Sequence, residues 1–173
     1  MKLAEKGYTL VELLVAITIM AMATAAAGEG IFQTLRNTER NSNHMTAVLA
    51  LQNSNQRISQ DVQMAQSVTT DNLTPPDFLV LSWIGRSSGN EYQVTYTLED
   101  IPGSTLKELR RNQSVNGSDN TTFVVAQYID SDPEKTSCNL TGGIISLTIT
   151  ANVGSGATME SETRTYQIVQ RPG

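Results

Sequence analysis

The most apolar part of the chain lies close to its N-terminus. Residues 8–28 read YTLVELLVAITIMAMATAAAG and contain one charged side chain, Glu12. As an α-helix this run would be about 31 Å long, which matches the hydrocarbon core of a bilayer. Lys2 and Lys6 precede it, and the positive-inside rule then leaves the leader in the cytoplasm and the bulk of the chain outside. The pattern predicts a single membrane-spanning helix.

Beyond this run the sequence stays compatible with a helix to about Val68. No proline occurs before Pro75, and the segment Thr74–Asp77 (TPPD) is predicted to end the helical part. Apolar residues at spacings of three or four predict one buried face, with Asn55 as a polar exception. These positions are Met45, Val48, Leu51, Asn55, Ile58, Val62 and Ala65. Residues 29–74 are therefore predicted to continue the first helix as an amphipathic segment.

After Pro75 short stretches of β-forming residues alternate with turns. In residues 91–98 apolar and polar positions alternate, as in a half-buried strand. The segment 154–156 (GSG) is predicted to be a flexible connection. The predicted strands are 78–83, 91–98, 106–111, 123–129, 144–151 and 163–169. Residues 75–173 are thus predicted to form a β-rich globular head. The fold class is α+β, with the long helix packed on an antiparallel sheet.

Composition narrows the function classes. The formal charge is −5, which argues against a general nucleic-acid binder, because neutralising phosphates needs a surplus of Lys and Arg. Cys138 is the only cysteine, so no intramolecular disulfide is possible, and it is predicted to be a small half-buried residue. His44 is the only histidine. These residues offer little for a catalytic triad or a zinc site, so we predict neither an enzyme nor a cofactor.

One acidic segment is a weak candidate for a metal site. Asp130, Asp132 and Glu134 alternate with other residues in a predicted loop, as calcium ligands do. The segment lacks a full ligand loop, and a solvated turn is the preferred interpretation.

A small basic cluster is the only concentration of positive charge in the predicted head. It consists of Lys107, Arg110 and Arg111. We predict a solvated strand face, with surface binding or DNA uptake as the alternative.

Glu12 is the unusual residue of the apolar run. A carboxylate inside a spanning helix costs about 3 kcal/mol on insertion scales, so a partner or a function is expected. Cutting the chain just before Tyr8 would create an α-amine close to this position. In a packed array of such helices, the amine of one chain would pair with the Glu12 carboxylate of a neighbour.

The segment Lys6–Glu12 (KGYTLVE), followed by residues 13–17 (LLVAI), closely resembles the class III signal of type IV prepilins and type II secretion pseudopilins. The resemblance implies that residues 1–7 are a leader and that prepilin peptidase cuts the Gly7–Tyr8 bond and methylates the Tyr8 amine. It also implies that Glu12 serves assembly and that residues 8–28 form the transmembrane and filament-core helix. The implied partners are other pilin or pseudopilin subunits and an inner-membrane assembly platform.

Three other interpretations of the N-terminus remain. Ala21–Ala23 and Ala25–Ala27 both fit the cleavage site of an ordinary secretory signal, although Glu12 would interrupt its apolar region. An uncleaved single-pass anchor leaves Glu12 unexplained. A core helix of a soluble protein would be shorter than this run.

Residues 56–65 (QRISQDVQMA) resemble the late first helix of J-type minor pseudopilins and W-type minor pilins. This second resemblance favours a minor subunit that helps to initiate or build a filament. The subunit would be anchored in the cytoplasmic membrane with its head outside the cytoplasm. A tip-associated binding module, either an adhesin or a DNA-capture pilin, and a major pilin are the alternatives.

Overall fold

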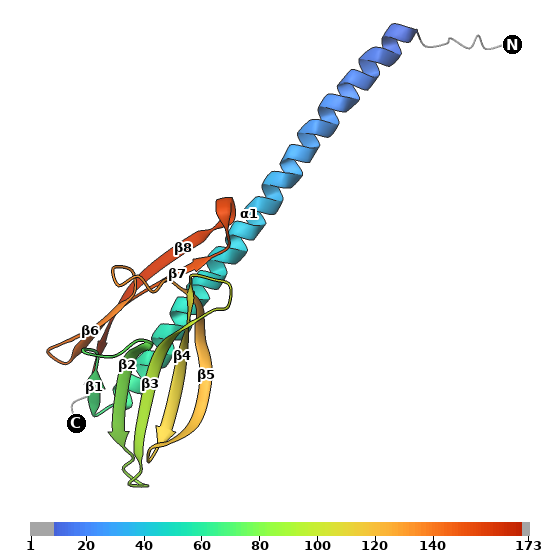
Figure 1. The fold of residues 1–173 in the computed structure, drawn as a ribbon. Helices are drawn as coiled ribbons and strands as arrows, with labels where there is room; N and C mark the ends of the chain where they lie inside the picture. The colour runs from blue at the N-terminus through green and yellow to red at the C-terminus, as the bar shows by residue number, and fades with distance from the viewer. Residues whose placement is uncertain (1–8, 171–173) are drawn as a thin grey trace. The chain divides into compact units, whose positions relative to one another are not determined.

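The computed structural model describes residues 9–170, without the side chains of Asp119 and Asn120. The chain divides into two compact units, Met1–Asn41 and Ser42–Gly173, which we call the N-terminal unit and the head unit. Helix α1 (Leu10–Met64) contributes its first part to the N-terminal unit and its second part to the head unit (Figure 1). Each unit is described by itself.

The N-terminal unit consists of helix in its described part. Its apolar side chains are solvent-exposed on every face, from Leu10 to Leu35. Helix α1 is long enough and apolar enough, near its N-terminus, to cross a membrane, and none of its most apolar window is buried. The prediction of a long apolar N-terminal helix is confirmed.

The head unit is an antiparallel sheet that curls around the second part of α1. The strand order is β1-β2-β3-β4-β5-β7-β6, and β8 pairs with β7. The strands are β1 (Ser67–Thr69), β2 (Asp77–Ile84), β3 (Glu91–Asp100), β4 (Lys107–Val115), β5 (Ser118–Ile129), β6 (Ser137–Thr141), β7 (Ile144–Val153) and β8 (Glu160–Val169). A single pair, Ile129 with Ala151, connects β5 to β7. The sheet therefore has two parts, β1–β5 and β6–β8, joined at one point.

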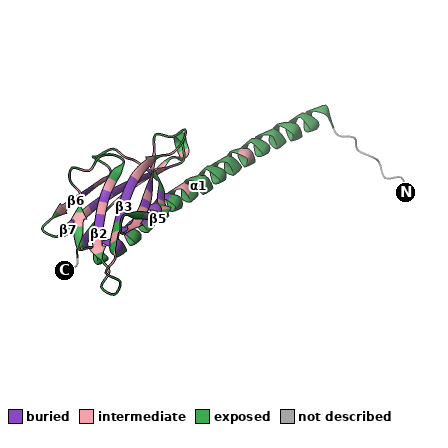
Figure 2. Ribbon diagram, turned by 60° about the horizontal axis from the view of Figure 1, so that its bottom comes forward, coloured by how far each residue is buried: buried purple, intermediate pink, exposed green. Residues whose placement is uncertain are grey.

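The core lies between the helix and the concave face of this sheet, where Figure 2 shows the buried residues. The helix contributes Leu51, Ile58 and Val62, which are fully buried. The strands contribute Leu79, Leu81, Val94, Leu109, Ile145, Leu147 and Ile149. Their alternation along each strand places one apolar face against α1, as the sequence pattern predicts. The predicted α+β fold is confirmed.

The helix ends earlier than predicted. Met64 is its last residue, and Ser67–Thr69 forms strand β1, which pairs with residues 80–82 of β2. The proline pair that was expected to stop the helix begins eleven residues further on, at Pro75. Because Val68 pairs with Leu81, tertiary pairing takes over a segment that is locally compatible with helix.

All six predicted strands occur, each longer than expected, and two more were missed. Short β1 lay within the predicted helix, and β6 is only five residues long, although Cys138 and Leu140 alternate with polar residues in it. Cys138, in β6, is buried beside β7 rather than half-buried.

The exposed connection between β7 and β8 is tied to α1 at one point. The Nδ2 atom of Asn43 donates a hydrogen bond of 2.8 Å to the carbonyl of Thr158, which fixes the short 3₁₀ turn Gly156–Thr158 against α1. Gly154 has φ +91°, and a Cβ atom there would lie 2.3 Å from the same Asn43 nitrogen. Close approach to the helix explains this glycine.

Candidate functional site

The first turn of α1 is built around Glu12. The Thr9 N–H and the Thr9 hydroxyl both donate to Glu12 Oε2 at 2.9 Å, and the Glu12 N–H donates to Thr9 Oγ1 at 3.3 Å. This reciprocal arrangement is a capping box, which satisfies amides that the helix leaves unpaired. The Thr-x-x-Glu pattern was the signal for it, and sequence reasoning missed it. In the single chain, Glu12 thus stabilises the helix start, which is a second role beside the predicted assembly contact.

Gly7 and Tyr8, the predicted cleavage and methylation site, lie outside the described residues. In the apolar part of α1 threonine hydroxyls bond to carbonyls of the same helix. The hydroxyls of Thr18 and Thr24 donate to the carbonyls of Val15 and Met20, both at 2.8 Å. A helix whose side chains are apolar all round and whose hydroxyls are satisfied internally suits a bilayer or a bundle of similar helices.

A buried ionic cluster holds the late part of α1 to the sheet. Asp61 accepts from Arg111 Nε at 2.7 Å and from Arg111 Nη2 at 3.0 Å, a bidentate pair. The Tyr96 hydroxyl donates to the same carboxylate at 2.5 Å. The side chains of Asp61 and Arg111 are 3% and 7% exposed, so water screens this pair very little. Burial, followed by the nearby Asp61 charge, raises the pKa of Tyr96, which keeps its hydroxyl protonated as a donor.

Sequence reasoning missed this cluster and misplaced Arg111. Asp61 was seen as part of a motif but not as a buried residue. Its signal was its position three residues after Ile58 and four before Ala65, on the buried face of the helix. Arg111 was expected on a solvated strand face, and this prediction is wrong, because Asp61 draws it into the core.

Residues 2–28 match the family model described as the prokaryotic N-terminal methylation motif. The chain carries a prepilin-type signal. No curated protein and no solved structure matches the chain. The motif supports a place in the type IV pilin-like family, and with it membrane anchoring by the apolar helix. It also implies processing by prepilin peptidase and assembly with other pilins.

The remaining cations of the basic cluster are paired in this pilin-like chain. Lys107 forms an ion pair with Asp100, which lies opposite it across β3 and β4. Arg110 Nε lies 2.5 Å from Glu108 and 3.4 Å from Glu99. The three residues therefore do not form a positive surface for phosphate groups.

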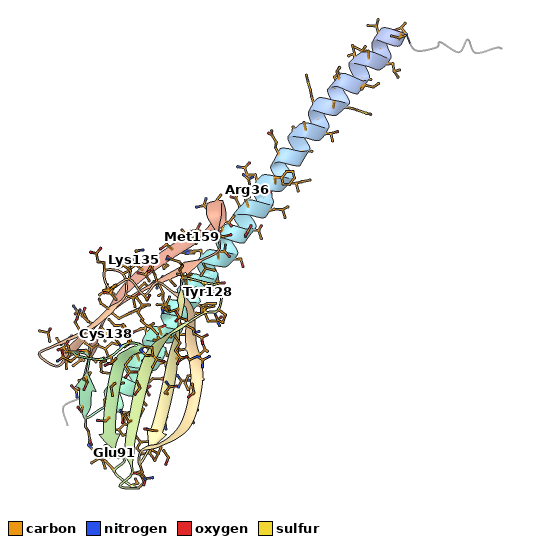
Figure 3. The ribbon with its side chains drawn as sticks, viewed as in Figure 1. Arg36, Glu91, Tyr128, Lys135, Cys138 and Met159 are labelled. Atoms are coloured by element: carbon orange, nitrogen blue, oxygen red, sulfur yellow. The ribbon has the colours of Figure 1, made fainter. Side chains whose placement is uncertain are left out.

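The acidic candidates for calcium do not converge on one point. Asp130 Oδ2 accepts from Lys135 Nζ at 2.8 Å and from Asn152 Nδ2 at 2.9 Å, and the bond from Lys135 helps to lower the pKa of Asp130. Asp132 Oδ1 accepts from the N–H of Glu134. Over residues 9–170 no three acidic, His or Cys side chains gather as metal ligands. The segment is a turn closed by Lys135, which Figure 3 labels.

Cys138 is 7% exposed in β6. Burial raises the pKa of its thiol to about 12, so little thiolate forms near neutral pH. This environment suits a packed side chain and not a nucleophile.

Proposed function

We propose that this chain is a minor structural subunit of a type IV pilus or a type II secretion pseudopilus. In this proposal it helps to start or build the filament. The observation that carries the proposal is the methylation motif of residues 2–28. The part of this motif from Leu10 onwards is an apolar helix with exposed side chains. Such a helix is costly in water and is accommodated either in the membrane or among sibling helices.

In the proposed topology the chain crosses the cytoplasmic membrane once, with its head outside the cytoplasm. Lys2 and Lys6 precede the apolar run and favour this orientation. Removal of residues 1–7 takes away two lysines and one glutamate, so the formal charge goes from −5 to −6. The partners would be other pilin-like chains, the peptidase and the assembly platform.

The proposed minor role rests on the resemblance of residues 56–65 to J-type and W-type subunits. Within this segment Asp61 and Ala65 are buried in the head unit. Residues 56–65 therefore belong to the part of the helix that packs on the large β-rich head. A head of this size suits a primer better than a densely repeated shaft subunit.

Subunit counting tests the minor role. We expect the chain to be a trace component of purified filaments, and we expect its deletion to abolish filament formation. Quantitative mass spectrometry of sheared filaments measures the first expectation and electron microscopy the second. If the chain is the most abundant component it is a major pilin, and the initiation role is refuted.

In the assembled filament we propose that Glu12 exchanges its capping partner for the Tyr8 amine of a neighbour. A charge pair shielded from water is worth more than a helix cap, so assembly would recover the cost of carrying a carboxylate in the membrane. Glu12→Leu removes both the charge and the cap. We expect this variant to insert normally, because an intramembrane charge is lost, and to reach filaments at about a tenth of the normal level or less.

Two further variants separate the assembly charge from the cap. Glu12→Gln keeps an acceptor for the Thr9 amide and loses the charge, whereas Thr9→Val keeps the charge and loses the hydroxyl of the cap. The proposal expects Glu12→Gln to fail like Glu12→Leu and Thr9→Val to assemble. Quantitative immunoblots of membrane and filament fractions give the readout. Normal incorporation of Glu12→Gln would show that no charge pair forms.

A further inference from the structure

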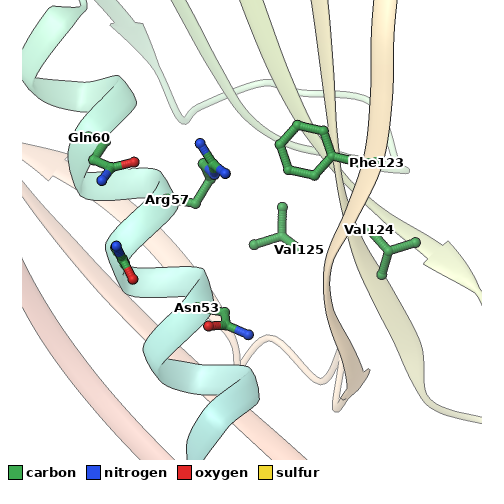
Figure 4. A pocket seen from close by; sticks show the side chains of 7 residues that line it. Asn53, Arg57, Gln60, Phe123, Val124 and Val125 are labelled. Carbon is green, nitrogen blue, oxygen red and sulfur yellow. The ribbon is translucent and has the colours of Figure 1, made fainter.

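A polar groove runs between α1 and β5 in the head unit. It has a volume of about 440 Å³ and is lined by four helix residues and three strand residues (Figure 4). These are Asn53, Gln56, Arg57, Gln60, Phe123, Val124 and Val125. Phe123 and Val125 turn towards the helix and form an apolar wall, and the helix supplies the polar wall.

The strand that borders the groove has a free edge. Strand β5 pairs with β4 along most of its length, but with β7 only at Ile129. Within residues 9–170 no further backbone hydrogen bond reaches residues 121–128 from the other side. An edge with unpaired amides and carbonyls accepts an additional strand.

Arg57 places a positive charge in the groove. Its guanidinium lies 5.1 Å from the centroid of the Phe123 ring, and Arg111 lies 5.5 Å from the same centroid. Arg111 is neutralised by Asp61, whereas Arg57 makes no ion pair with any described carboxylate. The aromatic contact positions Arg57 in advance, which lowers the entropy lost when an anion binds.

The rest of the helix wall suits a peptide backbone. Asn53, Gln56 and Gln60 follow one another at spacings of three and four, so their amides line one helical face. Each amide both donates and accepts hydrogen bonds. With the free β5 edge opposite, the groove offers polar partners on both sides of an extended chain.

We propose that this groove binds an extended acidic peptide segment of a neighbouring pilin-like subunit, which adds a strand to β5 and places a carboxylate on Arg57. The groove itself indicates an extended acidic peptide. That this peptide belongs to a filament subunit rests on the proposed function. Strand addition would pair the free edge, and Arg57, which has no ion pair with a described carboxylate, explains why the segment would be acidic.

The probe is a phage-displayed library of short random peptides, selected on the full-length protein in detergent micelles. We expect selected peptides to combine β-forming residues with Asp or Glu. A selected peptide, labelled and titrated by fluorescence anisotropy, should bind the Arg57→Gln variant about tenfold more weakly, because a charge-assisted hydrogen bond is lost. Methylating alternate backbone nitrogens of the peptide should abolish binding, because strand addition needs those amides.

Arg86→Gln is the matched control. It removes the same charge from an exposed position outside the groove and should leave peptide affinity unchanged. Failure to enrich any peptide overturns the proposal, as does equal binding to the wild type and Arg57→Gln. Selection of basic peptides overturns it as well. None of these outcomes bears on the filament role, which the Glu12 variants and the subunit count test separately.

Discussion

Replacing Asp61 with alanine should lower the free energy of unfolding of the head unit by about 3–5 kcal/mol, the cost of breaking a buried ion pair. The variant leaves the Arg111 guanidinium and the Tyr96 hydroxyl without their shared acceptor. A guanidinium cannot shed its charge, so the full desolvation cost remains. Denaturant titration of the full-length protein in detergent measures the loss, with the single tryptophan, Trp83 in β2, as the fluorescent probe.

Asp71→Ala is the matched control, since Asp71 is exposed in the connection after β1. We expect it to change the unfolding free energy by about 0.5 kcal/mol or less. A triple variant with Asp61→Leu, Arg111→Met and Tyr96→Phe replaces the whole cluster with apolar groups. It should recover much of the stability that Asp61→Ala loses, because no buried charge is left unpaired. If Asp61→Ala is as stable as the control, the ion pair does not hold the helix to the sheet.

Replacing Gly7 with valine should leave an uncut precursor in the membrane and abolish filament incorporation. We propose that the peptidase cuts after Gly7, and a branched side chain there would obstruct it. In the unaltered protein we expect the mature chain to begin at Tyr8 with a methylated amine. Intact-mass measurement distinguishes the precursor, which keeps its seven leader residues (MKLAEKG), from the methylated product.

Gly30→Val provides the control for this experiment. Gly30 lies in α1 with open space where a Cβ would stand, well beyond the proposed cleavage site, so processing should be normal. A wild-type chain that starts after Ala23, Ala25 or Ala27 would instead identify a secretory signal and would refute the pilin interpretation. Normal cleavage of Gly7→Val would show that the peptidase does not recognise this glycine.

The capping box at Thr9 and Glu12 connects the sequence motif to the physics of the helix. One carboxylate stabilises the helix start in the single chain, and in the proposed filament it would pair with a neighbour's amine. The Glu12→Gln and Thr9→Val variants therefore test whether the motif holds an acid because helices need caps or because filaments need charge pairs.

The N-terminal signal, the apolar helix and most of the strands can be predicted from the sequence alone. These features are local. A peptidase signal is contiguous, the free energy of membrane insertion adds up residue by residue, and strand alternation has a period of two. The α+β class followed from the order of the elements, because an amphipathic helix must cover the apolar face of a sheet.

The positions of the polar residues of the head unit, by contrast, depend on its tertiary structure. Asp61, Tyr96 and Arg111 come from three elements, and Asp61 is separated from its two partners by 35 and 50 positions. No local pattern shows that such residues meet in the core. The same holds for β1, where pairing with β2 overrides helix compatibility, and for the groove beside Arg57, whose two walls are α1 and the free edge of β5. Burial and pairing depend on which distant segments fold against each other, and that is settled when the sheet closes on the helix.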